Sequence, residues 1–142
     1  MAEVVTSIEI AAPPEAVWDV IMDPERLDEW VTIHRRLEDH SPTSMKQVLC
    51  LRGVSFNVDW KLTTDDRPHR AVWKGKGPAR SRAETEYTLE AIDGGTRFGY
   101  RNDFKAPLGP LGAVASKALV GGVPEREANA SLQRLKELLE HG

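Results

Sequence analysis

The chain has 142 residues, 40% of them apolar and 29% charged, which is enough apolar material to build a folded core. This length is typical of one domain, and we expect a single domain over residues 1–142. The 19 basic and 22 acidic side chains give a net charge of −3. That balance argues against a nucleic-acid-binding protein, which needs a basic surface. A single cysteine, Cys50, excludes an internal disulfide.

No stretch of the sequence predicts a membrane span. The least charged segment, Ala106 to Val123, contains a lysine, two prolines and several glycines. It falls short of the roughly 18–20 apolar residues that a transmembrane helix needs. Glu3 stands where a signal peptide carries positive charge. We therefore expect a cytoplasmic protein with no transmembrane segment.

The N-terminal part of the chain predicts one strand and two short helices. Residues 4–10 are rich in β-branched side chains, which favours a strand. Apolar residues at helical spacing over 17–21 then predict a short helix after two prolines. Asp23 is a plausible N-cap for a second short helix over 24–30.

The period of the apolar residues changes to two over residues 33–104, which predicts about six antiparallel strands. The Asp93-Gly94 pair is typical of a two-residue hairpin turn. A turn there places Glu86 opposite Arg101 and Glu90 opposite Arg97 on the outer face. A register shifted by two residues would instead place Glu86 opposite another acid, which is unfavourable.

The C-terminal residues predict a long helix. Apolar residues recur at helical spacing over 111–139, and Pro124 predicts a kink or a short break within this span. The order of elements is typical of an α+β domain. We expect a curved antiparallel sheet of six to seven strands wrapped around the C-terminal helix.

Several short stretches carry a resemblance to a known family. They are Val17–Ile21 with Asp23-Pro24 and Trp30, Arg67-Pro68, Gly94–Arg97, Pro107–Gly109 and Leu132–Lys136. On these stretches the chain resembles the START-like (SRPBCC) superfamily, specifically its polyketide cyclase/dehydrase and lipid-transport type. The resemblance covers nearly the whole chain and implies the helix-grip fold, with an apolar cavity between the sheet and the C-terminal helix. Its motifs mark the fold rather than a catalytic site.

Conventional active-site motifs are absent from the sequence. It holds no Gly-x-Ser-x-Gly elbow, no P-loop and no His-Glu-x-x-His pair. The four histidines lack the spacing of a metal site, so we expect no metal ion and no other cofactor. His34 is the histidine of most interest, because it follows Trp30 where a helix meets a strand. A rim or surface position is the simpler interpretation of it.

The alternating pattern places most aromatic side chains on one face of the sheet. A packed core is the simpler interpretation of each, but the resemblance implies a cavity at this face. A cluster of hydroxyl and amide groups on the same face would orient a ligand, or would satisfy itself. The ligand-binding residues that we expect are Trp30, Phe56, Trp60, Trp73, Thr85, Tyr87, Phe98, Tyr100, Asn102, Ala115 and Leu119.

The segment 67–83 carries six Lys or Arg residues and no acid. The simpler interpretation is a solvated outer face. The alternative is a basic rim at the cavity mouth that attracts an anionic substrate or an acidic carrier protein.

Three functions fit the sequence. The first is a carrier or sensor that binds a small hydrophobic or aromatic molecule in the cavity. The second is a polyketide cyclase or dehydratase, with Tyr87, Tyr100 and His34 as candidate catalytic residues. The third is a protein-interaction or stress-response module that uses the outer face of the sheet. The sequence favours the first function and leaves open whether the protein is an enzyme.

Overall fold

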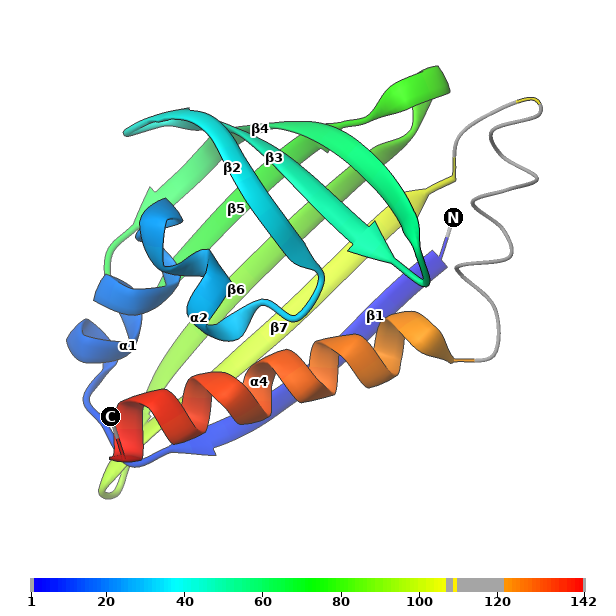
Figure 1. Ribbon diagram of the computed structural model, residues 1–142. Helices are drawn as coiled ribbons and strands as arrows, with labels where there is room; N and C mark the ends of the chain where they lie inside the picture. The colour runs from blue at the N-terminus through cyan, green and yellow to red at the C-terminus, as the bar shows by residue number, and fades with distance from the viewer. Residues whose placement is uncertain (1, 107–108, 110–121, 142) are drawn as a thin grey trace.

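A seven-stranded antiparallel sheet curves around a C-terminal helix in the computed structural model (Figure 1), which describes residues 2–106, 109 and 122–141. The strands are β1 (Ala2–Ile10), β2 (His34–Ser41), β3 (Ser44–Leu51), β4 (Val54–Asp66), β5 (Arg70–Lys76), β6 (Arg82–Ile92) and β7 (Gly95–Lys105). The helices are α1 (Pro14–Ile21), α2 (Leu27–Trp30) and α4 (Val123–His141), with 3-10 turns at Pro24–Arg26 and Pro78–Arg80.

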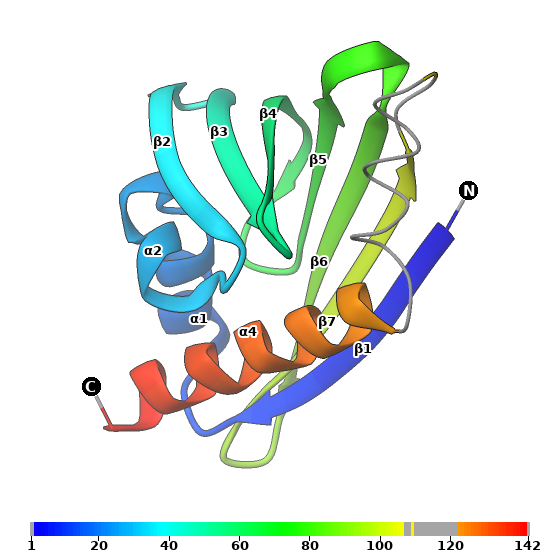
Figure 2. The ribbon, with the colours of Figure 1, turned by 45° about the vertical axis from the view of Figure 1, so that its right-hand side comes forward.

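The order of strands in the sheet is β1-β7-β6-β5-β4-β3-β2, and all neighbours are antiparallel. Helix α4 runs along the concave side of the sheet beside β1, α1 contacts β6 and β7, and α2 contacts α4 and the edge strand β2 (Figure 2). This architecture confirms the expected α+β helix-grip fold. None of the helices described is long and apolar enough to cross a membrane.

The β6–β7 hairpin has the register that the charge pattern predicts. Glu86 lies opposite Arg101, whose Nε donates to Glu86 Oε1 at 3.3 Å. Glu90 lies opposite Arg97, whose Nη1 donates to Glu90 Oε1 at 2.6 Å. Gly94 has a φ of 79°, a left-handed conformation that suits the turn. The turn chemistry and the outer-face charges therefore both support the same pairing.

The second predicted helix begins differently from the expectation. Asp23 caps it as predicted, because Asp23 Oδ1 accepts a hydrogen bond from the backbone N–H of Glu25 at 3.0 Å. The first turn, Pro24–Arg26, is a 3-10 turn, and regular α-helix follows only over Leu27–Trp30. Such tight turns are common at helix starts.

The predicted interruption of the C-terminal helix falls where α4 begins. Pro124 lies in its first turn, where the missing N–H of proline removes no hydrogen bond of the helix. Gly122 has a φ of 73°, so a right-handed helix does not continue through it. Residues 111–121, which we expected to form the preceding helical part, lie outside the described residues.

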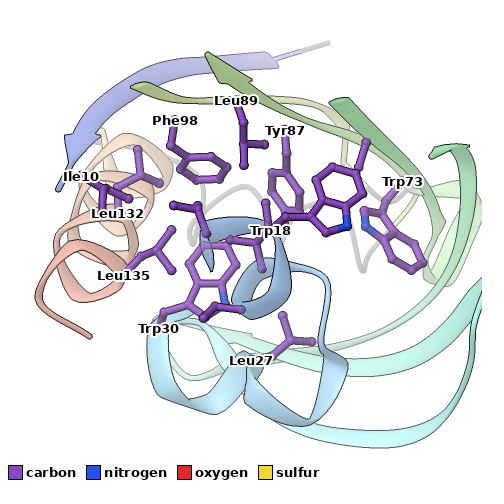
Figure 3. Packing of buried hydrophobic residues seen from close by; sticks show 14 of the residues in the cluster. Ile10, Trp18, Leu27, Trp30, Trp73, Tyr87, Leu89, Phe98, Leu132 and Leu135 are labelled. Atoms are coloured by element: carbon purple, nitrogen blue, oxygen red, sulfur yellow. The ribbon is translucent and has the colours of Figure 1, made fainter. Parts of the chain in front are cut away.

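The hydrophobic core joins the two layers (Figure 3). Ile10 of β1 and Leu132 and Leu135 of α4 are each at most 1% exposed and attach the helix to the sheet. The ring of Trp30, from α2, lies 6.1 Å from that of Tyr87 and 6.3 Å from that of Phe98, measured between centroids. Aromatic packing of this kind holds α2 against the concave face.

Candidate functional site

A cavity of about 210 Å³ lies between the concave face of the sheet and the helices α2 and α4. All strands except β2 contribute to the part of its wall that the structure describes. Most of the wall is apolar or aromatic; it includes Trp30, Met45, Leu49, Phe56, Val58, Trp60, Trp73, Tyr87, Tyr100, Phe104, Ala128 and Leu132. The side chains that alternate inward along β4 to β7 converge here, because successive residues of a strand point to opposite faces.

The structure brings most of the sequence-predicted site residues to this cavity. Trp30, Phe56, Trp60, Trp73, Thr85, Tyr87, Tyr100 and Asn102 border it. Phe98 does not border it: this residue is fully buried behind the wall, with its ring 5.5 Å from that of Tyr87. Ala115 and Leu119 lie outside the described residues.

Two tyrosines and their neighbours form a polar cluster on the wall. Tyr87 lies opposite Tyr100, and Thr85 lies opposite Asn102, so all four side chains share one face. Thr85 Oγ1 donates to Asn102 Oδ1 at 3.3 Å, and Tyr100 also hydrogen-bonds to Asn102. The cluster therefore borders the cavity and satisfies part of its own hydrogen bonding.

Burial controls the protonation of both phenols. It raises the pKa of Tyr100 to about 12, although the hydrogen bond from Asn102 partly opposes the shift. Burial also raises the pKa of Tyr87, and the nearby Tyr100 adds to that shift. Both phenols are consequently neutral at pH 7. They can donate or accept a hydrogen bond, but neither loses its proton near pH 7 to act as a base.

A chain of hydrogen bonds connects the wall to His34, which is the first residue of β2. Trp60 Nε1 donates to Gln47 Oε1 at 2.8 Å, and Gln47 Nε2 lies 2.8 Å from His34 Nδ1. The amide of Gln47 is a donor there, so His34 Nδ1 accepts and carries no proton. Burial lowers the pKa of His34, which favours the same neutral form. His34 itself is not among the described wall residues, but it contacts three of them: Gln47 through its ring, Val31 through its backbone N–H, and Leu49 as its partner on β3.

The indole nitrogen of Trp30 is a buried donor with no hydrogen-bond partner among the described residues. Trp30 is 1% exposed, and no acceptor for its Nε1 lies in the part of the chain that the structure describes. Buried polar groups in folded proteins almost always have a partner, and an exception needs a physical explanation. Because Trp30 borders the cavity, an acceptor held in the cavity would supply the missing bond.

Two residues of α4 place further polar groups at the cavity. Glu127 Oε2 accepts a hydrogen bond from Thr32 Oγ1 at 2.5 Å, and the backbone N–H of Thr32 donates to Ser131 Oγ at 3.0 Å. The sequence did not lead us to expect Glu127, Ser131 or Gln47 at the site. The spacing of Glu127 and Ser131, four residues apart on one helical face, was the available signal.

The described wall lacks the pair of acid and base that a proton-transfer enzyme uses. Glu127 is its one carboxylate, and Thr32 already occupies an oxygen of this group. Its two phenols are neutral, and its remaining polar groups are hydroxyls, amides, indole N–H groups and the cationic side chains of Arg82 and Lys105. Such an arrangement is suited to orienting a guest molecule.

The comparison with family models identifies the chain. A model described as "Polyketide cyclase / dehydrase and lipid transport" matches residues 1–140. The chain belongs to this family. Membership confirms the resemblance stated from the sequence motifs, and it is consistent with a cavity that accepts hydrophobic molecules.

Individual relatives are distant in sequence. The uncharacterized protein Rv1546 of Mycobacterium tuberculosis is 28% identical, over 97% of this chain and 99% of that protein. A second protein of this organism, Toxin Rv0910, is 23% identical over 91% of this chain and 95% of its own. The crystal structure of the Zhui aromatase/cyclase from a Streptomyces species superposes with a TM-score of 0.78. It is 17% identical and covers 98% of this chain and 93% of that chain, so this likeness shows the fold alone.

Proposed function

We propose that this protein binds a small, largely apolar molecule in the cavity between the sheet and α4, as a carrier or sensor. The observation that carries the proposal is the cavity itself, with a volume of about 210 Å³ and a mainly apolar and aromatic wall. An apolar protein cavity of roughly 150 Å³ is large enough to admit benzene. The space in this protein therefore suits a guest with at least one ring.

The polar groups of the wall support the same proposal. Ligand sites commonly combine an apolar wall with a few polar groups that fix the orientation of the guest. Here those groups are the Tyr100–Asn102 pair, Thr85, Gln47 and the unpartnered N–H of Trp30. A guest with one hydrogen-bond acceptor would use this N–H without disturbing any existing bond.

A polyketide cyclase is the second candidate, favoured by the family and by the one carboxylate on the described wall. A cyclase must remove a proton next to a carbonyl, which requires an available base. Glu127 is hydrogen-bonded to Thr32 and would have to exchange that bond for one to the substrate. A carrier needs no base, and for this reason we place it first.

The test is binding of N-phenyl-1-naphthylamine, a neutral aromatic probe that fluoresces in apolar surroundings. Ala83, on β6, borders the cavity and is partly buried, so Ala83→Phe would fill space that the probe needs. Ala91→Phe, on the same strand, is the matched control because Ala91 is exposed and does not border the cavity.

We expect saturable binding by the wild type and by Ala91→Phe, and at least tenfold weaker binding by Ala83→Phe. Thermal unfolding of all three proteins establishes that they are folded. If the folded wild type binds no probe, or if the two variants bind it equally well, the proposal is wrong.

A further inference from the structure

Two cations border the cavity at one end of the sheet. Arg82 is the first residue of β6, and Lys105 is the last residue of β7. Both are exposed, and both belong to the cavity wall, so they mark an opening of the cavity toward solvent. We call this end the cavity mouth. The register pairs the two residues directly opposite each other.

No acidic side chain that the structure describes forms an ion pair with either of these two cations. Like charges directly opposite on neighbouring strands are destabilising. Among the residues that the structure describes, neither Arg82 nor Lys105 forms an ion pair, whereas Arg67, Arg70, Arg97 and Arg101 all do.

The nearest acids on the same face already have basic neighbours. The next pair along the hairpin is Glu84 and Asp103. Asp103 Oδ2 accepts from Arg101 Nη1 at 2.6 Å, and Glu84 lies opposite Lys74 on β5. The positive charge at the mouth is therefore not neutralised by this row of acids. The carboxylate of Glu127 is on the helix side of the cavity and is bonded to Thr32.

We propose that the ligand of this cavity is an amphipathic anion, whose apolar part lies in the cavity and whose carboxylate, phosphate or sulfonate group lies between Arg82 and Lys105. This inference rests on the proposed binding function and specifies its ligand class. An anion between the two cations would remove their repulsion and form charge-assisted hydrogen bonds, with the guanidinium fork as a bidentate donor. A neutral apolar guest would leave the repulsion in place.

The test compares two probes that differ by one anionic group. N-phenyl-1-naphthylamine is neutral, and 8-anilinonaphthalene-1-sulfonate carries a sulfonate on the same ring system. The variant is Arg82→Gln/Lys105→Gln. The matched control is Arg35→Gln/Arg134→Gln, because these two arginines are exposed and do not border the cavity. Both double variants remove two positive charges, so they change the net charge equally.

We expect the wild type to bind the sulfonate probe about tenfold more tightly than the neutral probe at low salt, with the two probes displacing each other. In Arg82→Gln/Lys105→Gln, affinity for the sulfonate should fall about tenfold while affinity for the neutral probe stays within twofold. The control variant should keep both wild-type affinities within twofold.

Each of the other outcomes is decisive. If the neutral probe binds and the sulfonate gains nothing from the two cations, the inference about the anion is wrong and the binding function stands. Equal weakening of sulfonate binding by both double variants also overturns it, because the effect would then follow net charge rather than the mouth. If neither probe binds the folded wild type, the proposed function itself fails.

Discussion

Tyr87 and Tyr100 lie directly opposite each other on β6 and β7, with their ring centroids 6.2 Å apart. Both border the cavity, and burial raises the pKa of each phenol. A hydroxyl group that stays neutral supplies a hydrogen bond to a guest without the cost of burying a charge. The two tyrosines thus give an aromatic wall with two polar tips.

The phenol pKa values predict the alkaline behaviour of the protein. The chain has two tyrosines in all, so tyrosinate absorbance near 295 nm reports this pair alone. We expect no ionisation near pH 10 in the folded protein, and ionisation of Tyr100 near pH 12. Because the folded-state pKa lies above the unfolded value, stability should be complete below about pH 10 and fall as the pH rises toward 12. Normal titration of both phenols in folded protein would contradict their burial.

The unpartnered N–H of Trp30 predicts a specific NMR response. Binding of 1-acetylnaphthalene, which offers a carbonyl acceptor, should move the Trp30 indole proton downfield, whereas 1-ethylnaphthalene should not. The indole of Trp60 already donates to Gln47 at 2.8 Å and provides an internal control within each spectrum. An unmoved Trp30 resonance with both ligands bound would show that the carbonyl does not reach this donor.

Gly95, at the start of β7, occupies a position that we expect to tolerate only glycine. A Cβ at Gly95 would lie 2.0 Å from the carbonyl oxygen of Ile10, so the backbones of β1 and β7 would have to separate. We expect Gly95→Ala to lower the free energy of unfolding by about 2–3 kcal/mol. Gly94→Asn should lower the free energy of unfolding by less than about 1 kcal/mol. A Cβ at Gly94 would meet no described atom within 4 Å, and asparagine tolerates the positive φ of this position. Urea unfolding of both variants is the measurement, and equal losses would contradict the steric argument.

Glu86 lies between two arginines on the outer face of the sheet. A hydrogen bond from Arg70, and to a smaller extent one from Arg101, lowers the pKa of its carboxyl group. We expect Glu86→Gln to lose about 1 kcal/mol of stability at pH 7, because the pairs are only partly shielded from solvent. Glu90→Gln is the control and should lose less, since the Glu90 side chain is 67% exposed.

The same pKa shift gives the pH dependence of the Glu86 contribution. A lowered folded-state pKa contributes stability above the unfolded value of about 4.5, and this contribution is lost as the pH falls below it. The difference between wild type and Glu86→Gln should therefore shrink below pH 4.5. A difference that stays constant from pH 7 to pH 3 would rule out the ion pairs as its origin.

Local patterns in the sequence determined the faces of the strands and the register of the last hairpin. The period of two separates inward from outward side chains, and a one-residue slip would reverse every one of them. The Asp93-Gly94 turn and the pairing of Glu86 with Arg101 then select the register. For these reasons the sequence predicts that Trp60, Trp73 and the tyrosine pair share one face.

Only the tertiary structure decided which of these side chains border the cavity and which groups join them from elsewhere. The alternation along β7 places Phe98 on the inner face, but its side chain is packed behind the wall. By the alternation along their strands, Arg82 and Lys105 belong to the outer face. They border the mouth because Arg82 is the first residue of β6 and Lys105 is the last residue of β7. Thr32 meets Glu127 across 95 positions of sequence. Periodicity gives the direction of a side chain relative to its own strand or helix, whereas these contacts depend on the curvature of the sheet and on how α4 packs across it.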